Sequence, residues 1–226
     1  MLDRITSRLR EDIRTAIEKD PAARSVAATL TYPGLHAVWL HRLAHWLWTA
    51  GFCLSARVLS QVSRMLTGVE IHPAATLGRR VFIDHGMGVV IGETAEIGDD
   101  VHLFHGVTLG GDDPRPVDRH PTVEDGATLG ANATLVGDIT VGAGATVGAG
   151  AVVVDDVPAR VTVAGNPAEI IDDPREGAGE RDANDEGTAD PTEAGPVDPA
   201  SPGDRADEPA RQRASRGVLA SLRPGC

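Results

Sequence analysis

Residues 122–153 read TVEDGATLGANATLVGDITVGAGATVGAGAVV, and an aliphatic residue returns at every sixth position of this stretch. Glycine often follows the aliphatic residue directly, and a small or β-branched residue often occupies the fourth position after it. The same period extends upstream to residue 71, with two interruptions. The aliphatic residues in step are Ile71, Leu77, Ile83, Ile91, Ile97, Leu103, Leu109, Val123, Leu129, Leu135, Val141, Val147 and Val153.

A six-residue period kept over so many sites indicates a hexapeptide β-helix. Each hexapeptide supplies one short strand and one corner, and three of them make one coil of a triangular prism. The aliphatic side chain points inward and stacks on its counterpart in the next coil, so the repeats bury a core only against their neighbours. A glycine-rich linker has no reason to keep an aliphatic residue in step. We therefore predict a left-handed parallel β-helix over residues 69–170.

The segments on either side of the repeats differ from them in composition. Residues 1–68 carry apolar residues at helical spacing, which predicts an N-terminal α-helical region with helices near 2–20, 35–47 and 52–66. Residues 171–226 are rich in Asp, Glu, Pro, Gly and Ala, a composition typical of a disordered tail. The sequence thus predicts a helical region, a β-helix catalytic domain and an acidic tail.

Composition excludes several classes of function. The chain has 226 residues and a net charge of −12, so we expect neither nucleic acid nor an anionic membrane as a partner. The opening residues, MLDRITSRLREDIR, are too charged for the apolar core of a signal peptide. The most apolar helical stretch, residues 35–48, contains an arginine and three histidines and predicts no membrane span. Two cysteines make neither a disulfide framework nor a zinc cage, which favours the reducing cytoplasm.

Both interruptions of the period contain a histidine. Two extra residues lie around Asp84-His85-Gly86, and the stretch GGDDPRPVDRHPT, residues 110–122, leaves the prism as a loop. A regular scaffold that breaks its own rule usually does so for function. His85 and His120 are therefore the best candidates for chemistry.

Transfer of an acyl group from a thioester to an alcohol needs few protein groups. Histidine is suited to take the hydroxyl proton near neutral pH, and a carboxylate can orient the imidazole. A zwitterionic acceptor also needs a cation for its carboxylate and an anion for its amine. The residues that could supply these groups are His85 with Glu70 or Asp84, Arg119 with His120, and Asp20.

Several segments resemble bacterial serine acetyltransferases, over about residues 10–170. In the repeats these segments are EIHPAATLGRRVFIDHGMGVVIGETAEIG, VTLGG, DRHPTV and VGAGATVGAGAVV, and upstream they are KDPAARS and LTYPGLHAVWLHRLAHWLW. The DHGxG, VTLGG and RHP elements are specific to this family within the larger hexapeptide acyltransferase group. The resemblance implies acetyl transfer from acetyl-CoA to L-serine, giving O-acetyl-L-serine and CoA, the first step of cysteine biosynthesis from serine. It implies acetyl-CoA as a co-substrate, no permanently bound cofactor and no metal.

The resemblance also implies roles for individual residues. His85 matches the catalytic base. Glu70 stands where many members have an Asp that pairs with this base, and the Asp side chain is one methylene shorter than that of Glu. The residues that match serine-binding positions are Asp20, Asp84, Arg119 and His120, and those that match the acetyl-CoA groove are Gly110, Gly111, Ala131 and Ala149. The two substrates would meet between neighbouring subunits of a homotrimer, with a dimer of trimers as the alternative assembly. The loop residues DDPRPVD replace a family stretch that is usually rich in Gly and Lys.

Three other functions compete with this one. An acetyltransferase of the same fold for a sugar or antibiotic hydroxyl would need no charge clamp, so Asp20 and Arg119-His120 argue against it. A zinc lyase resembling γ-class carbonic anhydrases would use histidines such as His102 and His105, although their spacing is shorter than that family's pair. A non-enzymatic scaffold requires His85 to be dispensable.

The C-terminus bears on one possible partner. In the resembled family the last residues can enter the active site of O-acetylserine sulfhydrylase, where a final Ile is captured. This chain ends in Cys226, which is smaller and less apolar. Since ordering the tail costs entropy, we expect no tight sulfhydrylase complex through it.

Overall fold

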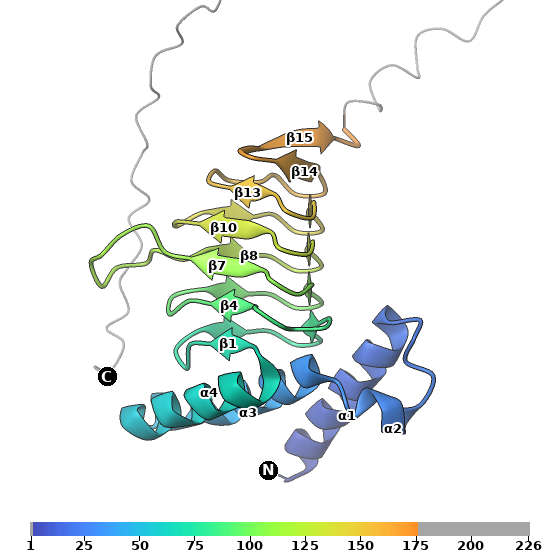
Figure 1. The fold of residues 1–226 in the computed structure, drawn as a ribbon, viewed down its shortest axis with the longest axis vertical. Helices are drawn as coiled ribbons and strands as arrows, with labels where there is room; N and C mark the ends of the chain where they lie inside the picture. Colours follow the sequence, from blue (N-terminus) through green and yellow to red (C-terminus); the bar gives the residue numbers. More distant parts are fainter. Residues whose placement is uncertain (1, 176–226) are drawn as a thin grey trace, which may run out of the picture.

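The computed structural model describes residues 2–175, which form a group of helices followed by a stack of short strands (Figure 1). The predicted tail lies outside the described residues from 176 onward, and Cys226 with it. Ile171 and Asp172, the first two residues of the predicted tail, end the last strand instead. Regular structure therefore continues two residues past residue 170, the predicted end of the β-helix.

Three long helices lie close to where the apolar spacing predicts them. Pro33 is the first residue of the third helix, where its missing N–H costs nothing, and Gly68 ends the fourth with a left-handed φ of 73°. A short helix was not predicted, and the Ser25 hydroxyl caps it by accepting from the Ala28 N–H. The helices are α1 (Leu2–Lys19), α2 (Val26–Thr29), α3 (Pro33–Thr49) and α4 (Cys53–Thr67).

The strands build three sheets, which are the faces of a prism. The first face contains β1 (Glu70–Ile71), β4 (Val90–Ile91), β7 (Thr108–Gly110), β10 (Thr134–Val136) and β13 (Val152–Val153). The second face contains β2 (Thr76–Leu77), β5 (Glu96–Ile97), β8 (Thr122–Val123) and β11 (Thr140–Val141). The third face contains β3 (Phe82–Ile83), β6 (His102–Leu103), β9 (Thr128–Leu129), β12 (Thr146–Val147), β14 (Thr162–Gly165) and β15 (Ala168–Asp172).

From β1 to β13 consecutive strands fall on consecutive faces, so the chain winds as a parallel β-helix. Within each face the strands are parallel, except that β15 turns back antiparallel to β14. The register stacks aliphatic residues of successive coils on one another: Ile71 pairs with Ile91, and Leu103 pairs with Leu129. Of the predicted inward aliphatics, only Leu77 is incompletely buried. The repeat-based prediction of the fold is confirmed.

The helices cover the first coil of the prism, where the stack would otherwise expose its core (Figure 1). Gly34 of α3 lies so close to β3 that a Cβ built on it would be 2.0 Å from the Ile83 carbonyl oxygen. His41 of the same helix is 4% exposed, so it lies in an interface inside the chain rather than on the surface.

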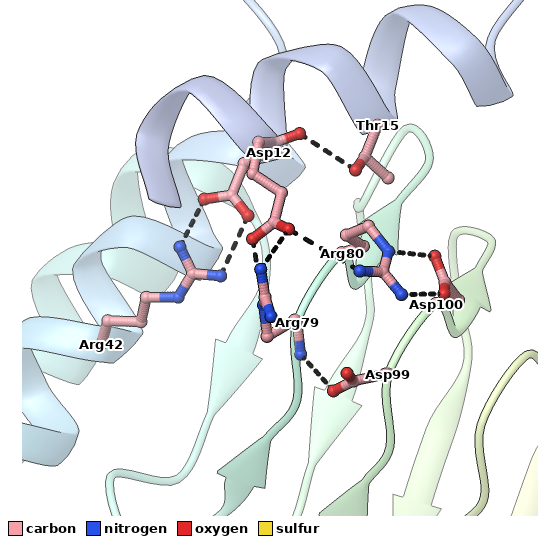
Figure 2. A network of polar contacts seen from close by, with 8 residues as sticks. Asp12, Thr15, Arg42, Arg79, Arg80, Asp99 and Asp100 are labelled. Atoms are coloured by element: carbon pink, nitrogen blue, oxygen red, sulfur yellow. Dashed lines mark hydrogen bonds and ion pairs between the residues drawn. The ribbon is translucent and has the colours of Figure 1, made fainter. Parts of the chain in front are cut away.

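Charged contacts hold α1 against the prism, as Figure 2 shows. Arg79 Nη2 lies 2.6 Å from a Glu11 carboxylate oxygen, and Arg80 forms a two-bonded ion pair with Asp100. Asp12, the residue after Glu11, binds Arg42 of α3. The middle of α1 is therefore tied to the prism and to α3, and Lys19 at its end donates to the Asp100 carbonyl.

Candidate active site

His85 stands on a corner that the two extra residues enlarge. We call the corner that leads from the third face into the first face the first edge. The backbone of His85 has a φ of 61°, a left-handed conformation that is uncommon for non-glycine residues. A hydrogen bond from the Gly86 N–H to the Asp84 carbonyl, 2.7 Å long, closes the turn. The imidazole consequently points outward, and 73% of the side chain is exposed.

Two carboxylates lie at the first edge. Asp84 Oδ1 is 3.8 Å from His85 Nε2, and the Asp84 side chain is only 19% exposed. Glu70 comes from β1, one coil below, and its carboxylate contacts Arg64 Nε at 3.3 Å. Asp84 is thus the carboxylate in contact with the imidazole, while Glu70 is ion-paired with α4.

Asp20 joins the same edge from the end of α1. One of its oxygens accepts the Ala22 N–H at 2.7 Å, and the other accepts the Tyr32 hydroxyl at 2.5 Å. These hydrogen bonds, that of Tyr32 first, lower the pKa of the Asp20 carboxyl, and the nearby charges of His85 and His102 lower it further. The structure therefore brings Asp20, from the end of α1, close to the corner that carries Asp84 and His85.

His120 stands at the corner that leads from the first face into the second, which we call the second edge. The Thr94 hydroxyl oxygen accepts the backbone N–H groups of Arg119 and His120, at 3.1 and 3.2 Å, and lies 2.8 Å from His120 Nδ1. The Thr94 N–H also points at Nδ1, so this nitrogen is an acceptor and the proton resides on Nε2. Burial, and then Arg119, lower the pKa of His120, so the ring is neutral near pH 7.

Glycines make room for the ring of His120. A Cβ on Gly92 would lie 1.9 Å from His120 Cδ2, and one on Gly111 would lie 3.1 Å from Nε2. His120 Nε2 accordingly lies next to both Gly92 and Gly111, the second of which starts the loop after β7. Gly110 and Gly111, two of the residues matched to the acetyl-CoA groove, lie at this edge.

Arg119 lies beside His120 and keeps unused donors. Its Nη1 donates to the Asp113 carbonyl at 2.7 Å, and its Nη2 is 3.8 Å from Glu93 Oε2. The buried Nε of Arg119 has no hydrogen-bond acceptor among the described residues. The Arg119 side chain is nevertheless 29% exposed, and an exposed guanidinium next to a neutral imidazole N–H is suited to bind a carboxylate.

The other two groove residues, Ala131 and Ala149, lie at the first edge, in the coils beyond His85. Backbone hydrogen bonds join those coils: the Asn132 N–H donates to the His105 carbonyl, and the Gly150 N–H to that of Ala131. The expected site residues therefore form two clusters at opposite edges of the first face. One chain brings each cluster together but leaves the two clusters apart.

Sequence reasoning missed Tyr32 and Thr94. Thr94 has no special place in the period, and Tyr32 is a tyrosine before a helix-starting proline; neither feature signals a contact with residues distant in sequence. Both are recognised only from the hydrogen bonds they make to Asp20 and His120.

The zinc alternative has no ready site in the part of the chain that the structure describes. Residues 2–175 contain no group of three or more His, Cys, Asp or Glu side chains placed to hold a metal ion. His102 instead stacks on Phe104, with ring centroids 4.4 Å apart, and His105 lies edge-on to His85 at 5.9 Å. In the same part of the chain, no helix has the length and apolarity to cross a membrane.

A prism of hexapeptide coils with histidines at its irregular corners defines the class of hexapeptide transferases. In agreement, residues 120–155 match the family model described as "Bacterial transferase hexapeptide (six repeats)", and the fold is the left-handed β-helix expected from the repeats. A serine acetyltransferase of Bacillus pumilus is 53% identical over 164 residues, which cover 72% of this chain and 76% of that protein.

Solved structures agree with this relative. Serine acetyltransferase of Brucella abortus in complex with coenzyme A superimposes with a TM-score of 0.73 at 44% identity, over 75% of this chain and 68% of that one. Soybean serine acetyltransferase complexed with serine gives 0.71 at 46% identity, over 73% and 68%. The chain belongs to the serine acetyltransferase family and is an acyltransferase.

Proposed function

We propose that this protein transfers the acetyl group of acetyl-CoA to the hydroxyl of L-serine, in the cytoplasm, as the first step of cysteine biosynthesis from serine. One observation carries the proposal: the two edges of the first face carry chemically complementary groups, such as the two ends of an amino acid require. The first edge has carboxylates and an exposed imidazole, and the second has a guanidinium and a neutral imidazole N–H. The Brucella abortus relative with coenzyme A and the soybean relative with serine support the choice of substrates.

A homotrimer would complete the site. Because the two clusters border the same face, a three-fold head-to-tail arrangement of parallel prisms puts the first edge of one subunit against the second edge of the next. Such an interface is heterologous, and a rotation that closes after three copies gives three identical sites. Acetyl-CoA would then lie in the groove between subunits, with Gly110 and Gly111 on one side and Ala131 and Ala149 on the other.

The charges assign each end of serine to one edge. Arg119 and the His120 Nε2–H hold the substrate carboxylate, and Asp20 and Asp84 attract its ammonium group. Bound in this way, serine presents its hydroxyl to the outward-pointing imidazole of His85.

The reaction needs His85 as both base and acid. The imidazole takes the hydroxyl proton as the serine oxygen attacks the thioester carbonyl. The tetrahedral intermediate collapses, the C–S bond breaks, and the imidazolium returns the proton to the CoA thiolate. A carboxylate supports the positive charge of the imidazolium. The family resemblance assigns this role to Glu70, although Asp84 is the carboxylate that contacts the imidazole within one chain. No redox partner or metal enters these steps.

A thiol-release assay tests the proposed activity. Purified protein is mixed with acetyl-CoA and, in parallel, with L-serine, L-homoserine or maltose. We expect rapid release with L-serine and little with the other acceptors. Faster release with maltose would instead support a sugar acetyltransferase, and release with none of them would contradict the proposal.

Subunit complementation tests the shared site. His85→Ala and Arg119→Ala damage opposite edges, so each variant alone should be nearly inactive at low serine concentration. Co-expressed in equal amounts, the two variants should regain up to about a quarter of wild-type activity. In trimers assembled at random, about a quarter of the interfaces join an intact first edge of one subunit to an intact second edge of the next. A mixture no more active than its components would show that each site lies within one chain.

A further inference from the structure

Tyr32 is not among the residues expected to bind substrate, yet it contacts one of them. Its hydroxyl donates to Asp20 Oδ2 at 2.5 Å, across twelve residues of sequence. The other oxygen of Asp20 accepts the Ala22 N–H. Because both oxygens are engaged, the Asp20 carboxylate is held in one orientation beside the first edge.

Tyr32 is itself fixed to the corner that carries His85. It directly precedes Pro33, the first residue of α3, and the backbone of Gly34 packs against Ile83. The Gly34 nitrogen also lies 3.7 Å from the position that a Cβ on Gly86 would occupy. The beginning of α3 therefore rests on the chain on both sides of His85.

Asp20 approaches from a different support. The preceding residue, Lys19, donates its ammonium to the Asp100 carbonyl at 2.5 Å, which ties the end of α1 to the second coil. Asp12 also joins α1 to α3, through Arg42, about two helical turns before Asp20. The Tyr32 hydroxyl is the group next to the start of α3 that contacts the Asp20 carboxylate itself.

We propose that Tyr32 is a positioning residue for substrate: its hydroxyl aims the Asp20 carboxylate at the ammonium group of the acceptor amino acid. The proposal rests on the proposed function, in which Asp20 binds that ammonium. Tyr32 transfers no proton and touches no reacting atom. The Tyr32 hydroxyl restricts the Asp20 carboxylate before the substrate binds, so that binding costs less conformational entropy.

The substitution Tyr32→Phe removes the hydroxyl and keeps the ring. Since a hydrogen bond to a charged group contributes enough to change a binding constant about tenfold, we expect a rise in KM for L-serine of roughly that size. The KM for acetyl-CoA and the Tm should stay close to wild type. Thr31→Val is the matched control, because it removes a neighbouring hydroxyl that bonds only to the Ala28 carbonyl.

A double-mutant cycle with Asp20→Asn separates positioning from a general structural role. If Tyr32 acts through Asp20, adding Tyr32→Phe to Asp20→Asn should raise the KM for serine little further. The proposal is overturned if the two effects multiply, if Tyr32→Phe leaves the KM for serine unchanged while Asp20→Asn raises it, or if both KM values rise together. A wild-type enzyme that does not acetylate serine would overturn the proposed function, and this assignment with it.

Discussion

At the scale of single residues, backbone conformation and its surroundings decide which side chains can react. His85 and His120 are both histidines at breaks in the same repeat, but their environments differ. The left-handed backbone of His85 turns its ring to solvent, whereas His120 is 8% exposed and anchored by Thr94. An exposed imidazole next to a carboxylate is suited to proton transfer, and a buried neutral one is suited to hydrogen-bond donation.

His85→Ala should lower kcat by about 10²–10⁴-fold, because that is the usual contribution of a positioned general base. The measurement is steady-state thiol release with saturating acetyl-CoA and serine. His36→Ala serves as the control, since His36 bonds the Leu30 carbonyl in the helical region. A His85→Ala enzyme with more than about a tenth of wild-type turnover would remove His85 from the role of base.

Glu70→Gln should lower kcat and leave both KM values nearly unchanged, because the group supports charge that develops on His85 only during the reaction. Asp84→Asn should chiefly raise the KM for serine. Comparing these two variants decides which carboxylate supports the imidazole, because Asp84 contacts His85 Nε2 whereas Glu70 pairs with Arg64. If Asp84→Asn loses kcat and Glu70→Gln does not, Asp84 is the partner of the imidazole.

At the scale of elements, the close approach of α3 to β3 links the helical region to the corner that carries His85. Gly34 permits this approach because any side chain would meet the Ile83 carbonyl. Asp84 and His85 follow Ile83 directly, so a shift of β3 would also move the proposed catalytic base. The helices consequently do more than cover the apolar end of the prism.

Gly34→Ala should destabilise the fold, because overpacking typically costs about 1–3 kcal/mol. In a protein of this size, that cost lowers the Tm by roughly 2–12 °C. It should also reduce kcat, since the displaced backbone carries His85. Differential scanning fluorimetry and the thiol-release assay measure the two effects. Ser55→Ala, at an exposed position on α4, should change neither quantity. An unchanged Tm for Gly34→Ala would mean that α3 lies farther from β3 than described.

At the scale of the whole molecule, burial of His41 makes stability depend on pH. Burial first, and then the charges of His45 and Arg42, lower the pKa of His41 to about 3. The unfolded chain binds a proton at this residue below about pH 6.5, whereas the folded chain does not until near its own lowered pKa. The stabilising effect of a neutral His41 is therefore complete above pH 6.5 and is lost progressively as the pH falls.

Urea unfolding at pH 7.5 and pH 5.5 should show lower stability at the lower pH, with His41 contributing up to about 1.4 kcal/mol per pH unit below 6.5. His41→Gln should reduce this dependence, whatever its effect on stability at pH 7.5. Ser55→Ala, at an exposed position without a titratable side chain, should leave the dependence unchanged. An identical dependence in the wild type and His41→Gln would contradict the assignment.

The sequence by itself determined the prism and its inward residues, and it predicts two places for the chemistry, at the breaks in the repeat. This was possible because a coil of hexapeptides contacts only its neighbours, so a short repeat contains most of the packing information. Only the tertiary structure decided which edge each break occupies, that Asp84 rather than Glu70 touches the imidazole, and that Tyr32 holds Asp20. These features depend on contacts between residues far apart in the chain, such as Lys19 with Asp100, and no periodic pattern encodes such pairs.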